Sequence, residues 1–265
     1  MKNFLVIGNP IKHSLSPKLH NFWIKKHDLK AVYDKKEINN INLKDLIQEL
    51  RSNKITGANV TVPFKNLVIP HLDELSNLAK TTNSVNTIYK KGEKIIGENT
   101  DSSGFEKALE HINYNVAGKK IFLLGAGGVV PSIIYSLEKK KAASITMSNR
   151  TKAKAQKIKD FFPNVNIINW GEMVNFDMII NATSLGLSKD DKLDFIVDNN
   201  YKNKFFYDVI YNPKKTNFLS IGEKNGSLIE NGKLMFLYQA QLAFEIWHGI
   251  KPLVDKAAID LVTND

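Results

Sequence analysis

The sequence lacks cysteine altogether. This absence excludes disulfide bonds and thiolate chemistry, and it is typical of a protein in a reducing compartment. No apolar run approaches the roughly 18 residues that a membrane-spanning helix needs. The first ten residues, MKNFLVIGNP, carry one lysine and no small-residue cleavage site, so they do not predict a secretory signal. We therefore expect a cytoplasmic protein that does not associate with membranes.

Arginine is scarce, although the chain is basic. The formal net charge is +10, yet Arg51 and Arg150 are the only arginines. The lysines are spread along the chain, and their densest stretch, residues 138–160, follows predicted helices. This pattern favours a solvated lysine-rich surface over a specific nucleic-acid interface. Such a surface also attracts small anionic ligands.

Metal-ligand spacing is missing as well. The histidines stand at positions 13, 20, 27, 71, 111 and 248, and none of these spacings is that of a known zinc motif. We therefore predict no metal site.

Strands and helices alternate along the chain, which predicts an α/β protein. In the first part we expect strands at 4–8, 31–38 and 57–62, helices at 17–27, 42–53 and 67–80, and a hairpin at 85–100. After a helix at 103–112, apolar runs at 121–124, 143–149, 165–169, 176–182 and 205–211 alternate with helical patterns. These runs predict a second, parallel sheet covered on both faces, and the chain closes with a long apolar helix at 233–252.

A glycine-rich turn follows the strand at 121–124 and consists of Gly125, Ala126, Gly127 and Gly128. Strand, turn and helix in this order form the pyrophosphate loop of dinucleotide-binding folds, because glycine lets the backbone approach the phosphates. The third glycine of the usual pattern is replaced by Val130, which we expect to crowd the helix–strand contact. Pro131 is acceptable because it falls in the first helical turn.

The next strand ends in Asn149, Arg150 and Thr151 and contains no acidic residue. An NAD site usually has Asp or Glu about 20 residues after the glycines, to bind the ribose 2′-hydroxyl. A guanidinium at this place instead suits a 2′-phosphate. The sequence therefore predicts NADP(H) as the cofactor.

Two segments near the N-terminus carry polar residues next to predicted strand ends. Ser16 is a suitable N-cap with Pro17 at the first helical position, which leaves Ser14 without a structural reason. Two hydroxyls at the start of a helix fit either a loop or a carboxylate-binding site. The strand at 57–62 ends at Pro63 and is followed closely by Lys65.

Motifs over nearly the whole chain, taken together, resemble those of shikimate dehydrogenases. They are, in order, GNPIKHSLSPKLHN from Gly8, GANVTVPFKN from Gly57, SVNT from Ser84, GENTDSSG from Gly97, GAGG from Gly125, NRT from Asn149, NATSLGL from Asn181, DVIYNPKKT from Asp208 and GKLMFLYQAQLAFEIW from Gly232. The resemblance implies NADPH-dependent, reversible reduction of 3-dehydroshikimate to shikimate, in aromatic amino acid biosynthesis. It also implies a substrate domain at 1–101, completed by C-terminal helices at about 236–265, and a Rossmann NADP-binding domain at 102–235.

The resemblance further implies roles for single residues. Lys65 and Asp101 match the catalytic pair; the alternative for Asp101 is an N-cap of the following helix. The substrate-binding residues implied are Ser14, Ser16, Thr61, Asn86, Tyr211 and Gln239. The cofactor-binding residues implied are Gly125, Ala126, Gly127, Gly128, Asn149, Arg150, Thr151, Thr183 and Gly232.

Lys65 either transfers the proton or only stabilises charge, and we favour proton transfer. Three other functions remain open. The enzyme could also oxidise quinate or use NAD, the chain could be a catalytically silent ligand-binding relative, or its basic surface could bind nucleic acid. We expect small-molecule substrates and a monomer or homodimer.

Overall fold

The computed structural model describes residues 1–188, 191–196 and 201–263. The chain divides into two compact units. Unit 1 comprises Met1–Gly104 and Leu237–Asp265, and unit 2 comprises Phe105–Phe236, so unit 2 is an insertion in the chain of unit 1. Residues 264–265 of the expected C-terminal segment lie outside the described residues. No helix in the described ranges is long and apolar enough to cross a membrane.

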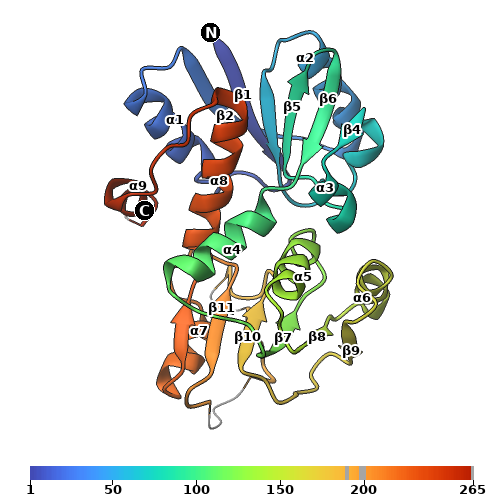
Figure 1. Cartoon of the computed structure of the whole chain (residues 1–265), viewed down its shortest axis with the longest axis vertical. Helices are drawn as coiled ribbons and strands as arrows, with labels where there is room; N and C mark the ends of the chain where they lie inside the picture. The colour runs from blue at the N-terminus through green and yellow to red at the C-terminus, as the bar shows by residue number, and fades with distance from the viewer. Residues whose placement is uncertain (189–190, 197–200, 264–265) are drawn as a thin grey trace. The chain divides into compact units, whose positions relative to one another are not determined.

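Unit 1 is built on a mixed sheet with the strand order β2-β1-β3-β5-β6-β4 (Figure 1). Its strands are β1 (Lys2–Gly8), β2 (Ala31–Glu37), β3 (Gly57–Val60), β4 (Glu74–Leu75), β5 (Thr87–Lys91) and β6 (Lys94–Glu98). Its helices are α1 (Ser16–Lys26), η1 (Asn40–Asn42), α2 (Leu43–Arg51), η2 (Ile69–His71), α3 (Asn77–Thr82) and α9 (Lys256–Leu261), together with the start of α4 (Asp101–His111) and most of α8 (Lys233–His248).

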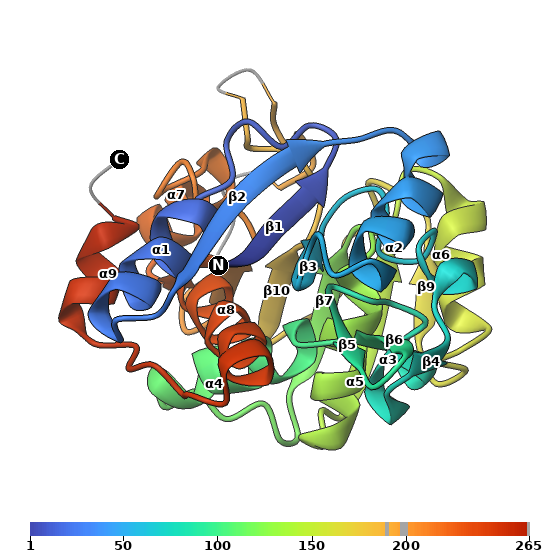
Figure 2. The same cartoon turned by 90° about the horizontal axis from the view of Figure 1, so that it is seen from above.

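Alternate residues of β1 face two separate parts of the core. Leu5 and Ile7 pack in one cluster with Leu50 of α2. Phe4 faces the other way and contacts Trp247 of α8, with ring centroids 4.9 Å apart. In Figure 2, α1 and α8 accordingly lie on one side of β1 and α2 on the other. This alternation follows from the period of two along a strand.

Trp247 anchors α8 on the sheet of unit 1. Its indole N–H donates to the carbonyl of Ile88 at 3.1 Å. A Cβ at Gly57 would stand 2.4 Å from the same indole nitrogen, so only glycine lets the ring lie this close to β3. The expectation that a C-terminal helix packs on the first part of the chain agrees with these contacts.

Unit 2 is built on a parallel sheet with the order β12-β11-β10-β7-β8-β9. Its strands are β7 (Lys120–Leu124), β8 (Ser144–Ser148), β9 (Asn166–Ile168), β10 (Met178–Asn181), β11 (Phe205–Asp208) and β12 (Leu228–Glu230); its helices include α5 (Val130–Lys139), α6 (Lys152–Lys159) and α7 (Asn217–Lys224). This is the strand order of the doubly wound dinucleotide-binding fold. The predicted parallel sheet is confirmed, although the sequence pattern missed β12.

The parallel sheet of unit 2 is covered on both faces. On β11, Tyr207 contacts Phe105 of α4 edge-on at 5.2 Å, while its neighbour Phe206 contacts Phe218 of α7 at 5.0 Å. Neighbouring strand residues point to opposite faces, so α4 and α7 lie on opposite sides of β11. Burial on both faces explains the nearly continuous apolar sequence FFYDVIY.

The helix predicted at 67–80 is wrong. In its place the chain forms the short η2, the two-residue strand β4 and then α3. Pro70 has no N–H to continue a helix, and Asp73 accepts the backbone N–H of Ile95 at 2.7 Å, which ties the segment to the sheet. Helix α3 then starts afresh, because the hydroxyl of Ser76 accepts the N–H of Ala79 at 3.1 Å.

Candidate functional site

Lys65 lies in the tight turn that follows β3. The N–H of Phe64 donates to Thr61 O at 2.9 Å and closes the turn, which explains why β3 ends at Val60 rather than at residue 62. The carbonyl of Lys65 accepts the N–H of Val85 at 2.8 Å, so its backbone is fixed to the start of β5. The Lys65 side chain is only 11% exposed.

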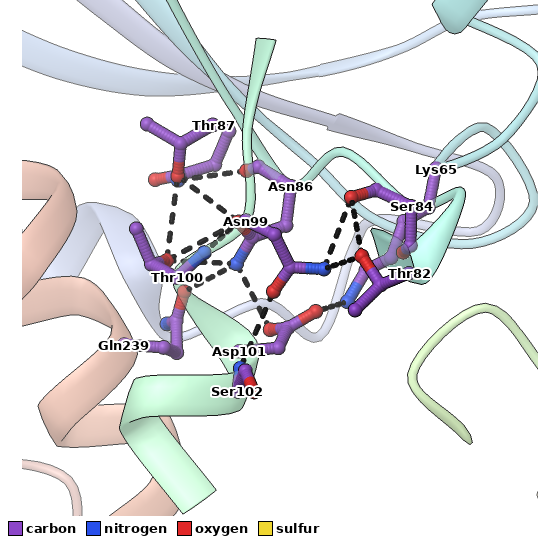
Figure 3. Close-up of polar contacts among 11 residues, drawn as sticks. Lys65, Thr82, Ser84, Asn86, Thr87, Asn99, Thr100, Asp101, Ser102 and Gln239 are labelled. Atoms are coloured by element: carbon purple, nitrogen blue, oxygen red, sulfur yellow. Dashed lines mark hydrogen bonds and ion pairs between the residues drawn. The ribbon is translucent and has the colours of Figure 1, made fainter. Parts of the chain in front are cut away.

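The Lys65 ammonium contacts the carboxylate of Asp101, the first residue of α4 (Figure 3). The Asp101 side chain is 7% exposed, so both charges are largely removed from water. Such a pair persists only when other groups satisfy its remaining hydrogen-bonding atoms. The resemblance implied that Lys65 and Asp101 form a catalytic pair, and in the structure their side chains are in contact.

Asn86 provides the second bond to Asp101. Its side-chain N–H donates to Asp101 Oδ1 at 2.9 Å, and its Oδ1 accepts the backbone N–H of Thr100 at 2.7 Å. Because a backbone N–H can only donate, this bond sets the amide of Asn86 with its NH₂ towards Asp101. The same NH₂ lies 3.3 Å from Oε1 of Gln239 on α8, so residues far apart in the sequence converge here.

Asp101 does not act as an N-cap. It is already helical, and the backbone N–H of Ser102 donates to Oδ1 of Asn99 at 3.2 Å instead. The side chain of Asp101 is therefore left to bind Lys65 and Asn86. Asn99 and Thr100 both stand in the GENTDSSG motif, but neither was predicted as a site residue.

The segments carrying Ser14, Ser16 and Thr61 lie at one edge of the sheet of unit 1. Strands β1 and β3 are parallel neighbours, so the loops after their carboxyl ends are adjacent. The N–H of Asn9 donates to Val62 O at 2.9 Å and joins the two loops. Hydroxyl-bearing residues from the first loop thus lie at the same edge as the turn that carries Lys65.

The N-cap predicted at Ser16 is wrong. Helix α1 includes Ser16, and the hydroxyl of Ser14 accepts the backbone N–H of Ser16 at 3.3 Å. The N-cap position is Leu15, and no side chain of the described residues caps the start of α1. The Ser16 hydroxyl is buried and bonds with the phenol of Tyr33.

In unit 2, the glycine turn after β7 has the shape that a dinucleotide requires. Gly125 has φ +114°, and a Cβ there would stand 2.7 Å from the carbonyl oxygen of Ala182, so only glycine fits. Gly127 is exposed, and a Cβ there would stand no closer than 3.9 Å to the Ala182 carbonyl oxygen, which leaves room for a phosphate. Val130 is fully buried at the first position of α5, with Pro131 in the first turn. The residues present therefore fit the cofactor.

Asn149, Arg150 and Thr151 stand directly beside this turn. The backbone N–H of Gly125 donates to Ser148 O at 2.9 Å, so the ends of β7 and β8 are in contact. Asn149 shapes the loop by donating its side-chain N–H to Thr151 O at 2.8 Å. Arg150 is exposed, and its guanidinium makes no ion pair within the described ranges.

Thr183 lies against the glycine turn, with its methyl group 3.2 Å from a Cβ built at Gly125. Its hydroxyl donates to Asn181 Oδ1 at 2.7 Å, and the amide of Asn181 donates to the buried Asp208 at 3.1 Å. Burial raises the pKa of Asp208 to about 6, although bonds from Thr216, Ile210 and Asn181 oppose this rise. Asn181 and Asp208 begin two of the motifs in the sequence, but no role was predicted for either residue.

Gly232 and Tyr211 have clear structural roles in unit 2. A Cβ at Gly232 would stand 1.9 Å from the carbonyl oxygen of Val209, so no other residue fits at the start of α8. The ring of Tyr211 stacks on Phe236 at 4.8 Å. Across the described residues, no group of three or more His, Cys, Asp or Glu could hold a metal ion.

Three protein-family models match the chain in succession. The shikimate dehydrogenase substrate binding domain matches residues 6–88. The shikimate/quinate 5-dehydrogenase model matches residues 106–214, and the shikimate 5′-dehydrogenase C-terminal domain matches residues 234–257. The matched ranges cover most of both units.

Individual proteins show the same similarity. A shikimate dehydrogenase (NADP(+)) of Pelagibacter ubique is 56% identical over 261 residues, which cover 98% of this chain and 98% of that protein. The crystal structure of shikimate dehydrogenase from Aquifex aeolicus has a TM-score of 0.90 and 37% identity, covering 100% of this chain and 98% of that one. A shikimate dehydrogenase crystallised in complex with NADP+ has a TM-score of 0.89 and 33% identity, covering 100% and 94%.

Proposed function

The chain belongs to the shikimate dehydrogenase family, and we propose that Lys65 and Asp101 are the catalytic pair with which it interconverts 3-dehydroshikimate and shikimate. The protein is an NADP-dependent oxidoreductase of the shikimate pathway. The observation that carries the proposal is the buried contact between the Lys65 ammonium and the Asp101 carboxylate, which Asn86 holds from the other side.

Lys65 donates the proton that the reduction requires. NADPH supplies the hydride when it is bound. Addition of hydride to the ring ketone leaves negative charge on the carbonyl oxygen, which the ammonium of Lys65 stabilises and then protonates, giving the alcohol. Solvent returns the proton to the Lys65 amine. Asp101 accepts a hydrogen bond from the ammonium and keeps it directed, while Asn86 stops the carboxylate from turning away.

Six further polar residues are proposed to bind the substrate. Ser14 and Ser16 stand at the positively polarised start of α1, which suits the substrate carboxylate, and Tyr211 is proposed to bind the same group. Thr61, Asn86 and Gln239 are proposed to bond the ring hydroxyls or the carboxylate. Asn86 already contacts Gln239, which supports their grouping.

The cofactor residues are proposed to lie in unit 2. The turn from Gly125 to Gly128 would bind the pyrophosphate, because Gly127 is exposed and the start of α5 favours negative charge. Asn149, Arg150 and Thr151 would bind the 2′-phosphate, and the exposed guanidinium of Arg150, which makes no ion pair with the described residues, supports this role. Thr183 and Gly232 complete the proposed set.

We assign substrate binding to residues 1–101 and about 236–265 and cofactor binding to residues 102–235. The substrate and cofactor are small molecules. A monomer or homodimer, a cytoplasmic location and no specific nucleic-acid partner complete the proposal.

Substitution of Lys65 tests the proposal. We expect Lys65→Ala to lower kcat for 3-dehydroshikimate reduction by ~10²-fold or more, the scale of a positioned proton-transfer group. Nicotinamide absorbance measures turnover. Lys90→Ala is the matched control, because Lys90 is also partly buried in unit 1 but donates to the carbonyl of Arg51. Turnover of Lys65→Ala near that of the unsubstituted enzyme would remove Lys65 from the chemistry.

Quinate is the second candidate substrate, because one matching family model is described as shikimate/quinate 5-dehydrogenase. The same assay run in the oxidative direction, with shikimate and quinate compared at equal concentration, decides between a selective and a dual-substrate enzyme. We expect a kcat/KM that favours shikimate. Binding without turnover of either compound would identify a silent relative instead.

A further inference from the structure

The short segment Ser84–Asn86, which leads into β5, contacts the elements that carry both members of the catalytic pair. The N–H of Val85 donates to Lys65 O at 2.8 Å and fixes the turn that carries the ammonium. The side chain of Asn86 donates to Asp101 at 2.9 Å and fixes the carboxylate. The segment is itself fixed in the sheet, since Val60 N donates to Asn86 O at 2.9 Å.

Asn99 joins this segment to the start of α4. It is 2% exposed, and its side-chain N–H groups donate to Ser84 O and to Oγ1 of Thr82, both at 3.0 Å. Its Oδ1 accepts the backbone N–H of Ser102 at 3.2 Å. One amide therefore holds the first turn of α4 with its oxygen and the Thr82–Ser84 segment with its nitrogen, as Figure 3 shows.

We propose that Asn99 is a positioning residue of the catalytic reaction, which sets where Asp101 lies relative to Lys65. This inference rests on the proposed catalytic role of that pair. Asp101 is the first residue of α4, two positions after Asn99, so a shift of the helix start moves the carboxylate directly. Lys65 does not move with it, because Val85 holds its backbone. A displacement of about 1 Å in a catalytic geometry can lower the rate ~10²-fold.

The helix-capping task of Asn99 can be separated from its link to Thr82 and Ser84. Serine is about as good an N-cap as asparagine, so Asn99→Ser keeps an acceptor for the N–H of Ser102. It removes the two N–H donors and adds no charge. If Asn99 acts only as a cap, this variant leaves kcat unchanged; if Asn99 positions Asp101, kcat falls.

A second variant approaches the link from its other end. Thr82→Val has nearly the same shape but removes the hydroxyl that accepts from Asn99, whereas Thr82→Ser retains it. Thr81→Val is the matched control, because Thr81 stands on the same helix, is exposed, and donates its hydroxyl locally to the carbonyl of Asn77 at 2.9 Å. These variants decide the question even if Asn99→Ser fails to fold.

The experiment measures kcat, KM for NADPH and the pH profile of kcat on the full-length enzyme, with melting temperature recorded for each variant. We expect Asn99→Ser to lower kcat ~10-fold to 10²-fold and Thr82→Val to lower it several-fold, with a displaced pH profile and an unchanged KM for NADPH. Thr82→Ser should recover most of the loss, and Thr81→Val should match the unsubstituted enzyme.

Failure of the positioning role and failure of the proposed catalytic pair give different results. A lower melting temperature with unchanged kcat and pH profile in Asn99→Ser and Thr82→Val overturns the positioning role and leaves Asn99 a structural cap. If Lys65→Ala, assayed in the same series, retains its turnover, the proposed catalytic pair itself is wrong. Loss of activity in Lys65→Ala with full activity in Asn99→Ser rejects the positioning role alone.

Discussion

At the residue scale, Lys65 and Asp101 are held by groups that are not charged. Burying an ion pair costs desolvation, and breaking it by removing one member leaves the other charge without compensation, at a cost of about 3–5 kcal/mol. We therefore expect Lys65→Ala to lower stability as well as activity, because among the described residues Asp101 keeps only the Asn86 bond on its side chain. The turnover assay must consequently be read on folded protein.

Arg150 allows a test of cofactor choice. We expect Arg150→Ala to raise KM for NADPH far more than KM for NADH, because only NADPH carries the 2′-phosphate with which a guanidinium pairs. The measurement compares both constants in one assay. Arg51→Ala is the control, since Arg51 is paired with Asp73 in unit 1. Equal increases for the two cofactors would reject the 2′-phosphate role.

His20 connects burial to acid stability. Its ring is stacked on Tyr33 at 4.2 Å, and both nitrogens are buried with no hydrogen-bond partner in the part of the chain that the structure describes. Burial, with a smaller contribution from His248, lowers the pKa of His20 from 6.5 to about 3. Between pH 6.5 and pH 3, His20 is therefore protonated in the unfolded chain but not in the folded chain. The stability that is present above pH 6.5 is lost as the pH falls towards 3.

We expect His20→Phe to flatten this acid dependence. The phenyl ring keeps the stacking shape and does not titrate. Between pH 7.5 and pH 5, the variant should therefore lose roughly 2 kcal/mol less unfolding free energy than the unsubstituted protein. Urea unfolding at both values measures the difference. His13→Gln, at an exposed histidine, controls for removal of one imidazole. Parallel acid dependences of His20→Phe and the unsubstituted protein would contradict the assignment.

The site residues differ in how far the sequence could reveal them. Lys65, Asp101 and Asn86 were predicted because their motifs resemble those of a family and the types of Lys65 and Asp101 suit the chemistry. Asn99 and Asp208 were missed, because their roles consist of bonds to residues distant in the chain: Asn99 to Thr82, and Asp208 to Asn181. No periodicity or local spacing records such a bond.

At the scale of elements, apolar periodicity predicted most strands and helices but not the segment at 67–80. The leucines there suggested one helix, whereas Pro70 and the pairing of β4 with β6 divide it. The strand β12 was missed because its three residues are too short to show alternation. Local sequence patterns therefore do not predict the secondary structure of a short segment when that structure depends on pairing with a distant strand.

Helix α3 depends on its N-cap more than a longer helix does. Ser76 accepts the N–H of Ala79 and donates its hydroxyl to Glu98 at 2.5 Å. We expect Ser76→Ala to lower the free energy of unfolding by about 1 kcal/mol, with kcat reduced little. Urea unfolding measures the change, with Ser188→Ala at an exposed loop position as control. A difference below ~0.3 kcal/mol between the two variants would show that the cap contributes little.

At the scale of the whole molecule, the sequence predicted two α/β sheets and the parallel character of the second. Buried parallel strands produce continuous apolar runs, and these are visible in a single sequence. The antiparallel pairing of β3 with β5 inside the first sheet was not predicted. It depends on which strands become neighbours, and a linear pattern does not contain that information.

The insertion of unit 2 into unit 1 has a consequence for biosynthesis. The ribosome delivers residues 105–236 as one uninterrupted stretch, so that sheet can be completed while translation continues. The first sheet must wait for Trp247 and Gln239, which emerge only after residue 237 and supply, respectively, its covering indole and a partner for Asn86. The half of the enzyme that is translated first is thus the half that matures last.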